Sequence, residues 1–264
     1  MLEAVTPVRP AAGYVGGKRN LAKTLLSMIA AIPHTTYAEV FIGMGGIFLR
    51  RDQRPQAEVI NDLSEDVSTF FRILQRHYVA FLDMLRFQLT SRAGFERLLK
   101  VDPTTLTDLE RAARFLYLQR IAFGGQVATR SYGVSPTNGA RFDLNKLTPL
   151  LEAIHERLSP VSIKRLNYQK FIARYDRPGT LFYLDPPYYG CEGDYGVELF
   201  TRSDFEAMAE QLSGIAGRFI LSINDHPDIR RTFAAFNIVE VQTPYSTGAA
   251  DRNKKITELV ISNG

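Results

Sequence analysis

The stretch Leu181-Phe182-Tyr183-Leu184-Asp185-Pro186-Pro187-Tyr188 decides the fold of this 264-residue chain. Its first four residues form an apolar run typical of a strand buried on both faces. Pro186 and Pro187 cannot continue such a strand, since proline donates no hydrogen bond to a neighbouring strand. The chain must therefore leave the sheet after Leu184, at the carboxyl edge where open α/β sheets bind their ligands.

The same tetrapeptide suits a flat heteroaromatic amine. Asp185 supplies an acceptor carboxylate, the prolines leave backbone carbonyls without competing N–H groups, and Tyr188 supplies an aromatic plate. The alternative is a strand end closed by a turn, which Asp-Pro alone would favour. The whole tetrapeptide, placed after four apolar residues, favours a site.

Other segments indicate strands that alternate with helices. Residues 37–42 read as a strand followed by glycines and a helix start near Ile47, and residues 57–60 read as a second strand before a helix capped by Ser64. Residues 218–223 read as a third strand, and residues 238–241 and 258–262 as an antiparallel hairpin. This alternation predicts an α/β fold with a mostly parallel sheet.

Composition excludes several classes of protein. With 45% hydrophobic and 23% charged residues, the chain can build a sizeable core. No apolar run approaches the roughly 18 residues of a membrane helix, and residues 1–12 do not resemble a signal peptide. Cys191 is the single cysteine and the four histidines lack metal-ligand spacing. We therefore expect a cytoplasmic protein with no membrane and no metal partner, in which Cys191 is structural or incidental.

The basic residues are concentrated in the middle of the chain. Residues 72–174 hold 17 Lys and Arg against 8 Asp and Glu, a net charge of +9, whereas the flanking segments are neutral and acidic. A solvated helical surface is the alternative, but such clustering favours a polyanion such as nucleic acid. Residues 64–123 have a helical pattern, and the glycine-rich stretch 123–142 carries hairpin signals and reads as a recognition element.

Two further signals point to a nucleoside-bearing cofactor. The glycine turn Phe41 to Gly46 follows the first strand and lets a ligand approach the backbone. It is not the dinucleotide pattern Gly-x-Gly-x-x-Gly, because Phe48 occupies the third glycine position. Asp62 ends the second strand, where an acidic residue can bind ribose hydroxyls. A tight strand-to-helix turn and a helix-capping Asp are the respective alternatives.

Taken in order, these motifs resemble one enzyme family. Tyr14-Val15-Gly16-Gly17-Lys18, the glycine turn, Asn61-Asp62 and Asp185 to Tyr188 follow one another, with the basic segment before the last motif. The chain is similar, over almost its whole length, to the Dam-type DNA adenine-N6 methyltransferases. The resemblance implies a Rossmann-like methyltransferase sheet of seven strands with an antiparallel terminal hairpin. It also implies a catalytic domain of residues 1–63 and 160–264 and an inserted, mainly helical recognition domain of residues 64–159.

The resemblance implies S-adenosylmethionine as the methyl donor. The residues that would bind it are Tyr14, Lys18, Phe41, Gly43, Gly45, Asp62, Asn167, Tyr168 and Asp185. In this set Asp62 would bind the ribose, and Asn167 and Tyr168 match only loosely the positions that flank the cofactor's adenine.

The catalytic residues implied are Asp185, Pro186, Pro187 and Tyr188. Hydrogen bonds from adenine N6 to Asp185 and the Pro186 carbonyl would localise its lone pair, and Tyr188 would stack on the ring. The amine would then attack the methyl group in line after the base has flipped out of the duplex. Tyr189 would be a second wall of the pocket or simply a surface ring, and the loop 190–197 would close over the pocket.

Sequence reading would fall to the basic segment. Its stretches 124–130 and 135–137 depart from the Dam pattern, so the resemblance does not decide whether the target is GATC. The base-reading candidates are Arg130, Tyr132, Asn138 and Arg141. The phosphate-binding candidates are Arg92, Lys100, Arg120, Lys146 and the loop 252–255 with Lys254.

Three rival functions stay open at this stage. Cytosine-N4 methylation is the same chemistry, although Asp rather than Ser before Pro-Pro-Tyr argues against it. An RNA adenine-N6 methyltransferase is a second rival, and a non-catalytic DNA-binding module on a methyltransferase scaffold is a third. Double-stranded DNA is the expected partner, and we expect a monomer, with a dimer as the alternative.

Overall fold

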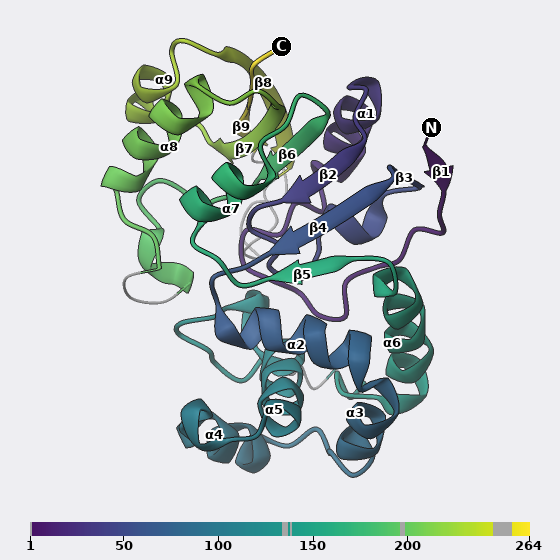
Figure 1. Ribbon diagram of the computed structural model, residues 1–264. Coiled ribbons are helices and arrows are strands. Elements are labelled where there is room, and N and C mark those ends of the chain that lie inside the picture. Colours follow the sequence, from purple (N-terminus) through teal and green to yellow (C-terminus); the bar gives the residue numbers. More distant parts are fainter. Residues whose placement is uncertain (1, 134–136, 138, 196–198, 245–254) are drawn as a thin grey trace.

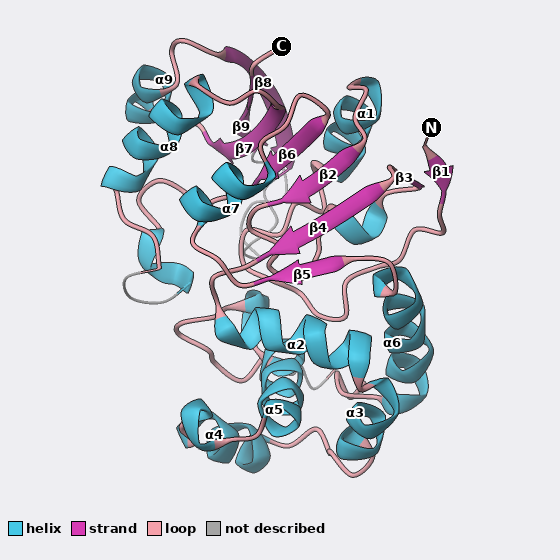
Figure 2. Ribbon diagram, in the orientation of Figure 1, coloured by secondary structure: helices cyan, strands magenta, loops and turns pink. Residues whose placement is uncertain are grey.

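A computed structural model of the chain describes residues 2–133, 137, 139–195, 199–244 and 255–264. Its centre is a seven-stranded sheet of order β5-β4-β2-β6-β7-β9-β8 (Figure 2). The strands are β2 (Thr36–Glu39), β4 (Ala57–Asn61), β5 (Ser162–Lys164), β6 (Thr180–Leu184), β7 (Arg218–Asn224), β8 (Asn237–Pro244) and β9 (Lys255–Ser262). The first five in spatial order are parallel, and β9 pairs antiparallel with β7 and β8. This arrangement confirms the predicted fold class, including the terminal hairpin.

The helices fall into two groups (Figure 1). The helices that accompany the sheet are α1 (Ala22–Ala31), α7 (Tyr168–Tyr175), α8 (Ser203–Ser213) and α9 (Pro227–Thr232). The helices of the basic segment are α2 (Glu65–Arg76), α3 (Tyr78–Leu85), α4 (Arg92–Lys100), α5 (Asp108–Ile121) and α6 (Leu144–Leu158), which lie together below the sheet in Figure 1. Short 3₁₀ turns span Phe48–Arg50 (η1), Pro103–Thr105 (η2), Phe123–Gly125 (η3) and Glu192–Tyr195 (η4), and β1 (Glu3–Ala4) pairs with β3 (Gln53–Arg54). None of the helices in the described part of the chain has the length and apolarity needed to cross a bilayer.

The apolar run before Asp185 is buried on both faces of the sheet, as its pattern predicts. Leu181 and Tyr183 of β6 belong to one hydrophobic cluster, whereas Phe182 and Leu184 belong to a second cluster across the sheet. Alternate residues of a strand point to opposite faces, so a central strand covered on both sides has no polar face. The exit of the chain after Leu184 is therefore held between two packed layers.

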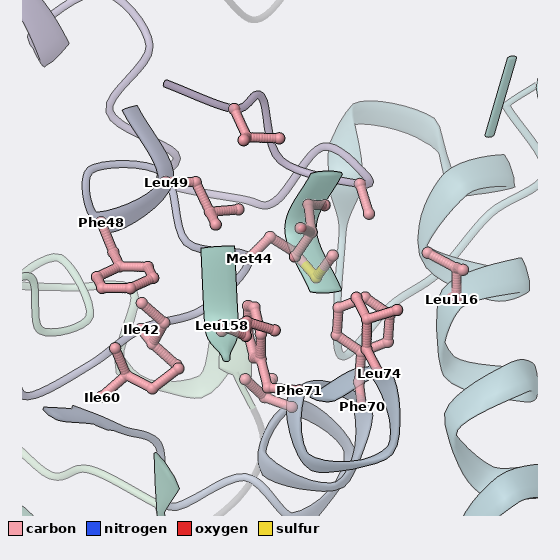
Figure 3. Close-up of a cluster of buried hydrophobic side chains, with 14 of the residues drawn as sticks. Ile42, Met44, Phe48, Leu49, Ile60, Phe70, Phe71, Leu74, Leu116 and Leu158 are labelled. Atoms are coloured by element: carbon pink, nitrogen blue, oxygen red, sulfur yellow. The ribbon is translucent and has the colours of Figure 1, made fainter. Parts of the chain in front are cut away.

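The first cluster runs without interruption from the sheet into the basic segment. Figure 3 shows Ile42 and Ile60 on one side of Phe70 and Phe71 of α2 and Leu116 of α5 on the other. The proposed boundaries near residues 63 and 160 coincide with the steps from β4 to α2 and from α6 to β5. Because the two parts share one core, their division into separate domains stays a prediction.

Two local expectations differ from the structure. The strand expected over residues 37–42 ends at Glu39, and only the η1 turn forms where a helix was expected near Ile47. The cause is the backbone of Gly43 and Gly45, whose φ values of 49° and 76° turn the chain. Near the start of the stretch 123–142, the described residues form η3 and an antiparallel bridge between Ala122 and Tyr132, flanked by hydrogen bonds from Phe123 N–H to the Ser131 carbonyl and from Gly133 N–H to the Ile121 carbonyl.

Candidate active site

The carboxyl ends of β4, β2 and β6 lie side by side and line a cavity of about 580 Å³. The cavity is bounded by the N-terminal segment 9–19, residues 41–44, 46 and 47 of the glycine turn, Arg50, residues 62–64, Glu39, Arg120, Leu150, Tyr183, Asp185, Pro187, Leu199 and Phe200. The adjacency follows from the strand order, since β2 pairs with both β4 and β6. A parallel sheet thus brings together motifs that are far apart in the sequence.

The N-terminal segment is fixed across the mouth of this cavity. Val15 donates to the carbonyl of Gly125 over 2.9 Å, and the Gln119 side chain donates to the carbonyls of Gly13 and Gly125 over 2.9 and 2.7 Å. The Tyr14 ring lies against Gly43, where an added Cβ would come within 3.0 Å of the ring. The segment that carries Lys18 is therefore held between η3 and the glycine turn.

Lys18 lies at the centre of a buried charge cluster. Its Nζ donates to the Tyr188 hydroxyl over 2.8 Å and lies 3.0 Å from Asp185 Oδ1 and 3.3 Å from Glu258 Oε2. It also lies 4.1 Å from the centroid of the Tyr188 ring. Burial alone would lower the pKa of this ammonium, but the negative charge of Asp185, with Tyr188 and Glu258, raises the pKa above its ordinary value. Lys18 is therefore charged at neutral pH.

Asp185 is the member of the cluster that a ligand can reach, because its side chain is 21% exposed whereas that of Lys18 is 2% exposed. Its Oδ1 also accepts a hydrogen bond from the Ser222 hydroxyl over 3.2 Å, and Ser222 is hydrogen-bonded to the Tyr183 hydroxyl. Burial raises the pKa of the Asp185 carboxyl to about 6, against the opposing effect of Lys18. The carboxylate is thus ionised at neutral pH, with lone pairs left to accept further hydrogen bonds.

Asp62 ties the glycine turn to the end of β4. Its Oδ2 accepts from the backbone N–H of Gly43 over 3.0 Å, and its Oδ1 accepts from the backbone N–H of Ser64 over 2.9 Å. Burial raises the pKa of Asp62 to about 6 even though both bonds favour its charged form. Ser64 is the N-cap residue of α2 as expected, but its own side chain makes no capping hydrogen bond. The Asp62 side chain instead accepts from the Ser64 backbone N–H at the start of the helix.

Glu39, which the sequence analysis did not single out, also lines the cavity. It is 1% exposed and accepts a hydrogen bond from the Tyr37 hydroxyl over 2.6 Å. Burial raises the pKa of its carboxyl to about 8. The signal that could have identified it is a carboxylate inside the otherwise apolar run 37–42, and Glu258 interrupts an apolar strand in the same way.

Phe41 forms part of the cavity wall, but two of its expected companions lie behind it. The Tyr168 ring packs 6.1 Å from that of Phe41, and its hydroxyl donates to Asp204 at the start of α8. Asn167 caps α7 by accepting from the backbone N–H of Gln169. Neither Asn167 nor Tyr168 lines the cavity as the structure describes it, so their assignment to the cofactor stays a prediction.

The remaining residues of the two motifs have distinct positions. Gly45 faces the core, where a Cβ would come within 2.9 Å of the Leu49 side chain, and Pro186 is buried. Pro187 lines the cavity. Tyr188 is not among the lining residues, but its hydroxyl accepts a hydrogen bond from Lys18, which is. Tyr189, expected as a second wall, donates to Asp228 and stacks on His226 instead.

Arg120, expected at the DNA phosphates, and Arg141, expected at the bases, both donate to backbone carbonyls. Arg120 donates to Ala11 and to the carbonyl of Arg141, and Arg141 donates to the Ala122 carbonyl over 3.3 Å. These contacts fasten the glycine-rich loop to α5 and to the N-terminal segment. The guanidinium N–H groups used in these hydrogen bonds are the same kind of donor that contacts with DNA would require.

Arg130 and Tyr132 are the other two base-reading candidates among the described residues. Arg130 Nη2 donates to Gln119 over 3.2 Å, and its buried Nε has no hydrogen-bond partner among the described residues. The Tyr132 ring packs edge-on against Phe95 and lies under the guanidinium of Arg92. Asn138 and Lys254 lie outside the described residues. Their roles in DNA binding, like those of Arg120, Arg130, Tyr132 and Arg141, stay predictions.

A mostly parallel sheet with a terminal antiparallel hairpin, a glycine turn and an Asp-Pro-Pro-Tyr strand exit beside a cavity that holds Glu39, Asp62 and Asp185 defines a Rossmann-like methyltransferase. Residues 14–247 match the family model of the D12 class N6 adenine-specific DNA methyltransferases. The chain belongs to this family and is an adenine-specific DNA methyltransferase, which confirms the resemblance noted from the motifs.

Individual relatives are distant in sequence. The chain is 25% identical to the type II methyltransferase M1.LlaDCHI of Lactococcus lactis subsp. cremoris, over 97% of this chain and 95% of that protein. It is 20% identical to the type II methyltransferase M.CviBI of Paramecium bursaria Chlorella virus NC1A, over 97% of this chain and 100% of that protein. Among solved structures, a putative RNA methyltransferase from Pyrococcus horikoshii aligns with a TM-score of 0.39 and 9% identity, over 92% of this chain and 82% of the other.

Proposed function

We propose that this enzyme transfers a methyl group from S-adenosylmethionine to N6 of an adenine flipped out of duplex DNA, by direct in-line attack. The observation that carries the proposal is the position of Asp185, a partly exposed carboxylate that lines the cavity and lies 3.0 Å from the Lys18 ammonium. When bound, S-adenosylmethionine supplies an electrophilic methyl group on a positively charged sulfur.

The residues of the cavity fit the chemical groups of this donor. Glu39 is a buried carboxylate whose pKa is raised to about 8, so a cation such as the methionine ammonium would hold it ionised. Asp62 retains lone pairs for ribose hydroxyls beyond the two backbone bonds that it accepts. Phe41 offers an aromatic wall, and Tyr14 and Lys18 close the cavity from the N-terminal segment.

The acceptor side follows from the exocyclic amine of adenine, which is a poor nucleophile because its lone pair is delocalised into the ring. A hydrogen bond from N6–H to Asp185 and a second to the Pro186 carbonyl would localise that lone pair on nitrogen. The new N–C bond forms as the C–S bond breaks, and the proton then leaves N6. Asp185 acts as an acceptor and not as a nucleophile, so positioning supplies much of the rate.

The DNA side rests on the basic segment and on one side chain that the sequence analysis missed. Phe123 in η3 is 60% exposed, and two residues later Gly125 packs against the backbone of Tyr14 at the cavity. An exposed apolar ring beside a base pocket can fill the gap that a flipped base leaves in the stack. We assign Phe123 this role.

The setting of the enzyme is part of the same proposal. The relatives' names include type II methyltransferases, which supports a place in a restriction–modification pair. We expect a monomer in the cytoplasm, and light scattering of the purified protein tests whether it is a monomer. Among the described residues no cluster of three or more His, Cys, Asp and Glu could hold a metal ion.

The test is transfer of a labelled methyl group from S-adenosylmethionine onto duplex DNA, RNA and free adenine nucleotides, followed by nucleoside analysis. N6-methyladenine in duplex DNA supports the proposal. N4-methylcytosine, or a product confined to RNA, would replace it with one of the rivals, and DNA binding without transfer would indicate a non-catalytic module. Sequencing the product with modified-base detection identifies the site and checks whether it is GATC.

A further inference from the structure

Glu258 is a buried carboxylate that the proposed reaction does not use. It lies on β9 between β7 and β8, paired in register with Asn224 on one side and Val241 on the other. Its residue is 6% exposed, and its Oε2 has no hydrogen-bond partner among the described residues. The nearest cation to this oxygen is Lys18 Nζ, at 3.3 Å. A buried carboxylate is costly without a partner, so its place beside Lys18 needs an explanation.

Lys18 is shared between two carboxylates, and one of them has another task. Its ammonium lies 3.0 Å from Oδ1 of Asp185, the side chain proposed to accept a hydrogen bond from the target amine. That oxygen also accepts from Ser222. An ammonium paired with Asp185 draws electron density from the acceptor and occupies space beside it. The arrangement therefore opposes the amine unless the ammonium can move.

The flexible partner in this cluster is the lysine. Glu258 is fixed in the middle of a sheet by strands on both sides, whereas Lys18 has four methylene groups and is attached to the N-terminal segment. A small rotation of the Lys18 side chain would lengthen its contact with Asp185 and shorten its contact with Glu258. The Tyr188 hydroxyl, 2.8 Å from Nζ, can remain bonded to the ammonium in either position.

We infer that Glu258 is a positioning residue that takes over the Lys18 ammonium when the target amine binds Asp185. This inference rests on the proposed function, since it assigns Asp185 to the acceptor amine. In the free enzyme the ammonium keeps Asp185 ionised, and in the complex Glu258 holds the ammonium away from it. The net charge of the three groups stays −1 throughout, so no proton is needed for the exchange.

The charges around Asp185 give this inference a signature in pH dependence. Asp185 faces Lys18 of the N-terminal segment, Glu258 of β9, Glu39 of β2, Tyr183 of β6, Ser222 of β7 and Tyr188 of its own loop. The negative charge of Glu258 raises the pKa of Asp185, whereas Lys18 lowers it. Removal of the Glu258 charge would therefore lower the pKa of Asp185, and the Lys18 ammonium would stay in contact with the Asp185 carboxylate.

The experiment compares E258Q with E240Q in single-turnover methylation of DNA that carries the mapped site. Glu240 is a matched control, because it is a carboxylate on the same hairpin that lies at the surface and pairs with Arg230. For E258Q we expect a rate at least about tenfold below wild type at neutral pH and an acid midpoint of kcat/KM shifted downward. The affinity for S-adenosylhomocysteine should stay within about threefold, and E240Q should match wild type in all three measurements.

A double-mutant cycle with K18M separates positioning from a loss of structure. If Glu258 acts through Lys18, K18M/E258Q is no slower than K18M alone. If E258Q folds and has the wild-type rate and the wild-type acid midpoint of kcat/KM, the inference is overturned. Fully additive losses in the cycle would overturn it as well. If E258Q does not fold, E258D replaces it, and a rate loss in E258D that is equally large in the K18M background would overturn the inference. Wild-type enzyme that fails to methylate adenine in DNA would refute the proposed function instead.

Discussion

Lys18 and Tyr188, which lie 170 residues apart in the sequence, are joined by a hydrogen bond of 2.8 Å from Nζ to the tyrosine hydroxyl. This bond links the N-terminal segment to the Asp-Pro-Pro-Tyr exit of β6. It places a positive charge beside Asp185 before any ligand arrives. The residues of the proposed acceptor site are thus held in position by contacts within the protein, which is a condition for catalysis through positioning.

Asp185→Ala should abolish methyl transfer while the cofactor still binds. The substitution removes the acceptor for the target amine, and we expect a loss of at least about 100-fold in the single-turnover rate. Lys18 keeps Glu258 as a partner, so the cluster is not left with an unpaired cation. Retained turnover in this variant, with S-adenosylhomocysteine bound as in wild type, would remove Asp185 from its assigned role.

Methylation should fail at acid pH because of Asp185. Its pKa is raised to about 6, so the ionised form that accepts a hydrogen bond is present above pH 6 and is lost as the pH falls through that value. We expect kcat/KM, which reports the free enzyme, to be about tenfold lower at pH 5 than at pH 7. Lys18→Met should move the midpoint upward, because Lys18 lowers the pKa of Asp185. A profile that is flat from pH 5 to 7 would contradict this account.

Glu39→Gln should weaken cofactor binding and remove a proton that binding releases. A lost charge-assisted hydrogen bond of about 1.5–3 kcal/mol corresponds to about 10- to 100-fold in affinity. The pKa of Glu39 is about 8 in the free protein, so the carboxyl is protonated at pH 7 and must lose that proton to pair with an ammonium. Calorimetry in buffers of different ionisation enthalpy should detect the proton in wild type and not in E39Q. Equal proton release in both proteins would assign the proton to another group.

Phe123→Ala should slow the methylation of paired DNA without affecting stability. The ring is 60% exposed, so its removal leaves no cavity in the core. If it fills the space left by the flipped base, we expect a loss of about tenfold on a perfect duplex. A duplex with a mismatch at the target adenine needs less energy for flipping, so F123A should regain most of its rate there. Equal losses on both duplexes would assign Phe123 to general DNA contact.

Arg130→Ala should relax sequence discrimination. Its Nη2 is bonded to Gln119 and its Nε is buried, so a role in base reading requires the side chain to turn outward when DNA binds. The matched control is Arg86→Ala, which removes an exposed arginine of the same segment that pairs only with Asp83 among the described residues. Modified-base sequencing of DNA treated with each variant measures the preference. An unchanged site preference in R130A would exclude it from base reading.

Much of the fold was predictable because its signals are local. The apolar run 181–184 and the strand 57–60 lie within one residue of the observed strands, and the strands of the hairpin near the C-terminus lie within three. The strand at 37–42 was predicted too long, since a glycine turn with positive φ ends it early. Within residues 123–142 the described residues contain one antiparallel bridge, between Ala122 and Tyr132, and Asn138 of the Asn-Gly hairpin signal lies outside the described residues.

The sequence by itself determined the class of this enzyme, through Asp185 to Tyr188, the glycine turn and Asp62. These motifs depend on the covalent properties of proline and glycine and on strand periodicity, which need no knowledge of distant contacts. Only the tertiary structure decided that Glu39 and Glu258 belong to the site, and that Arg120 and Arg141 are bonded to backbone carbonyls. The partners of a buried charge are set by strand order and by the packing of remote segments, so no local pattern contains them.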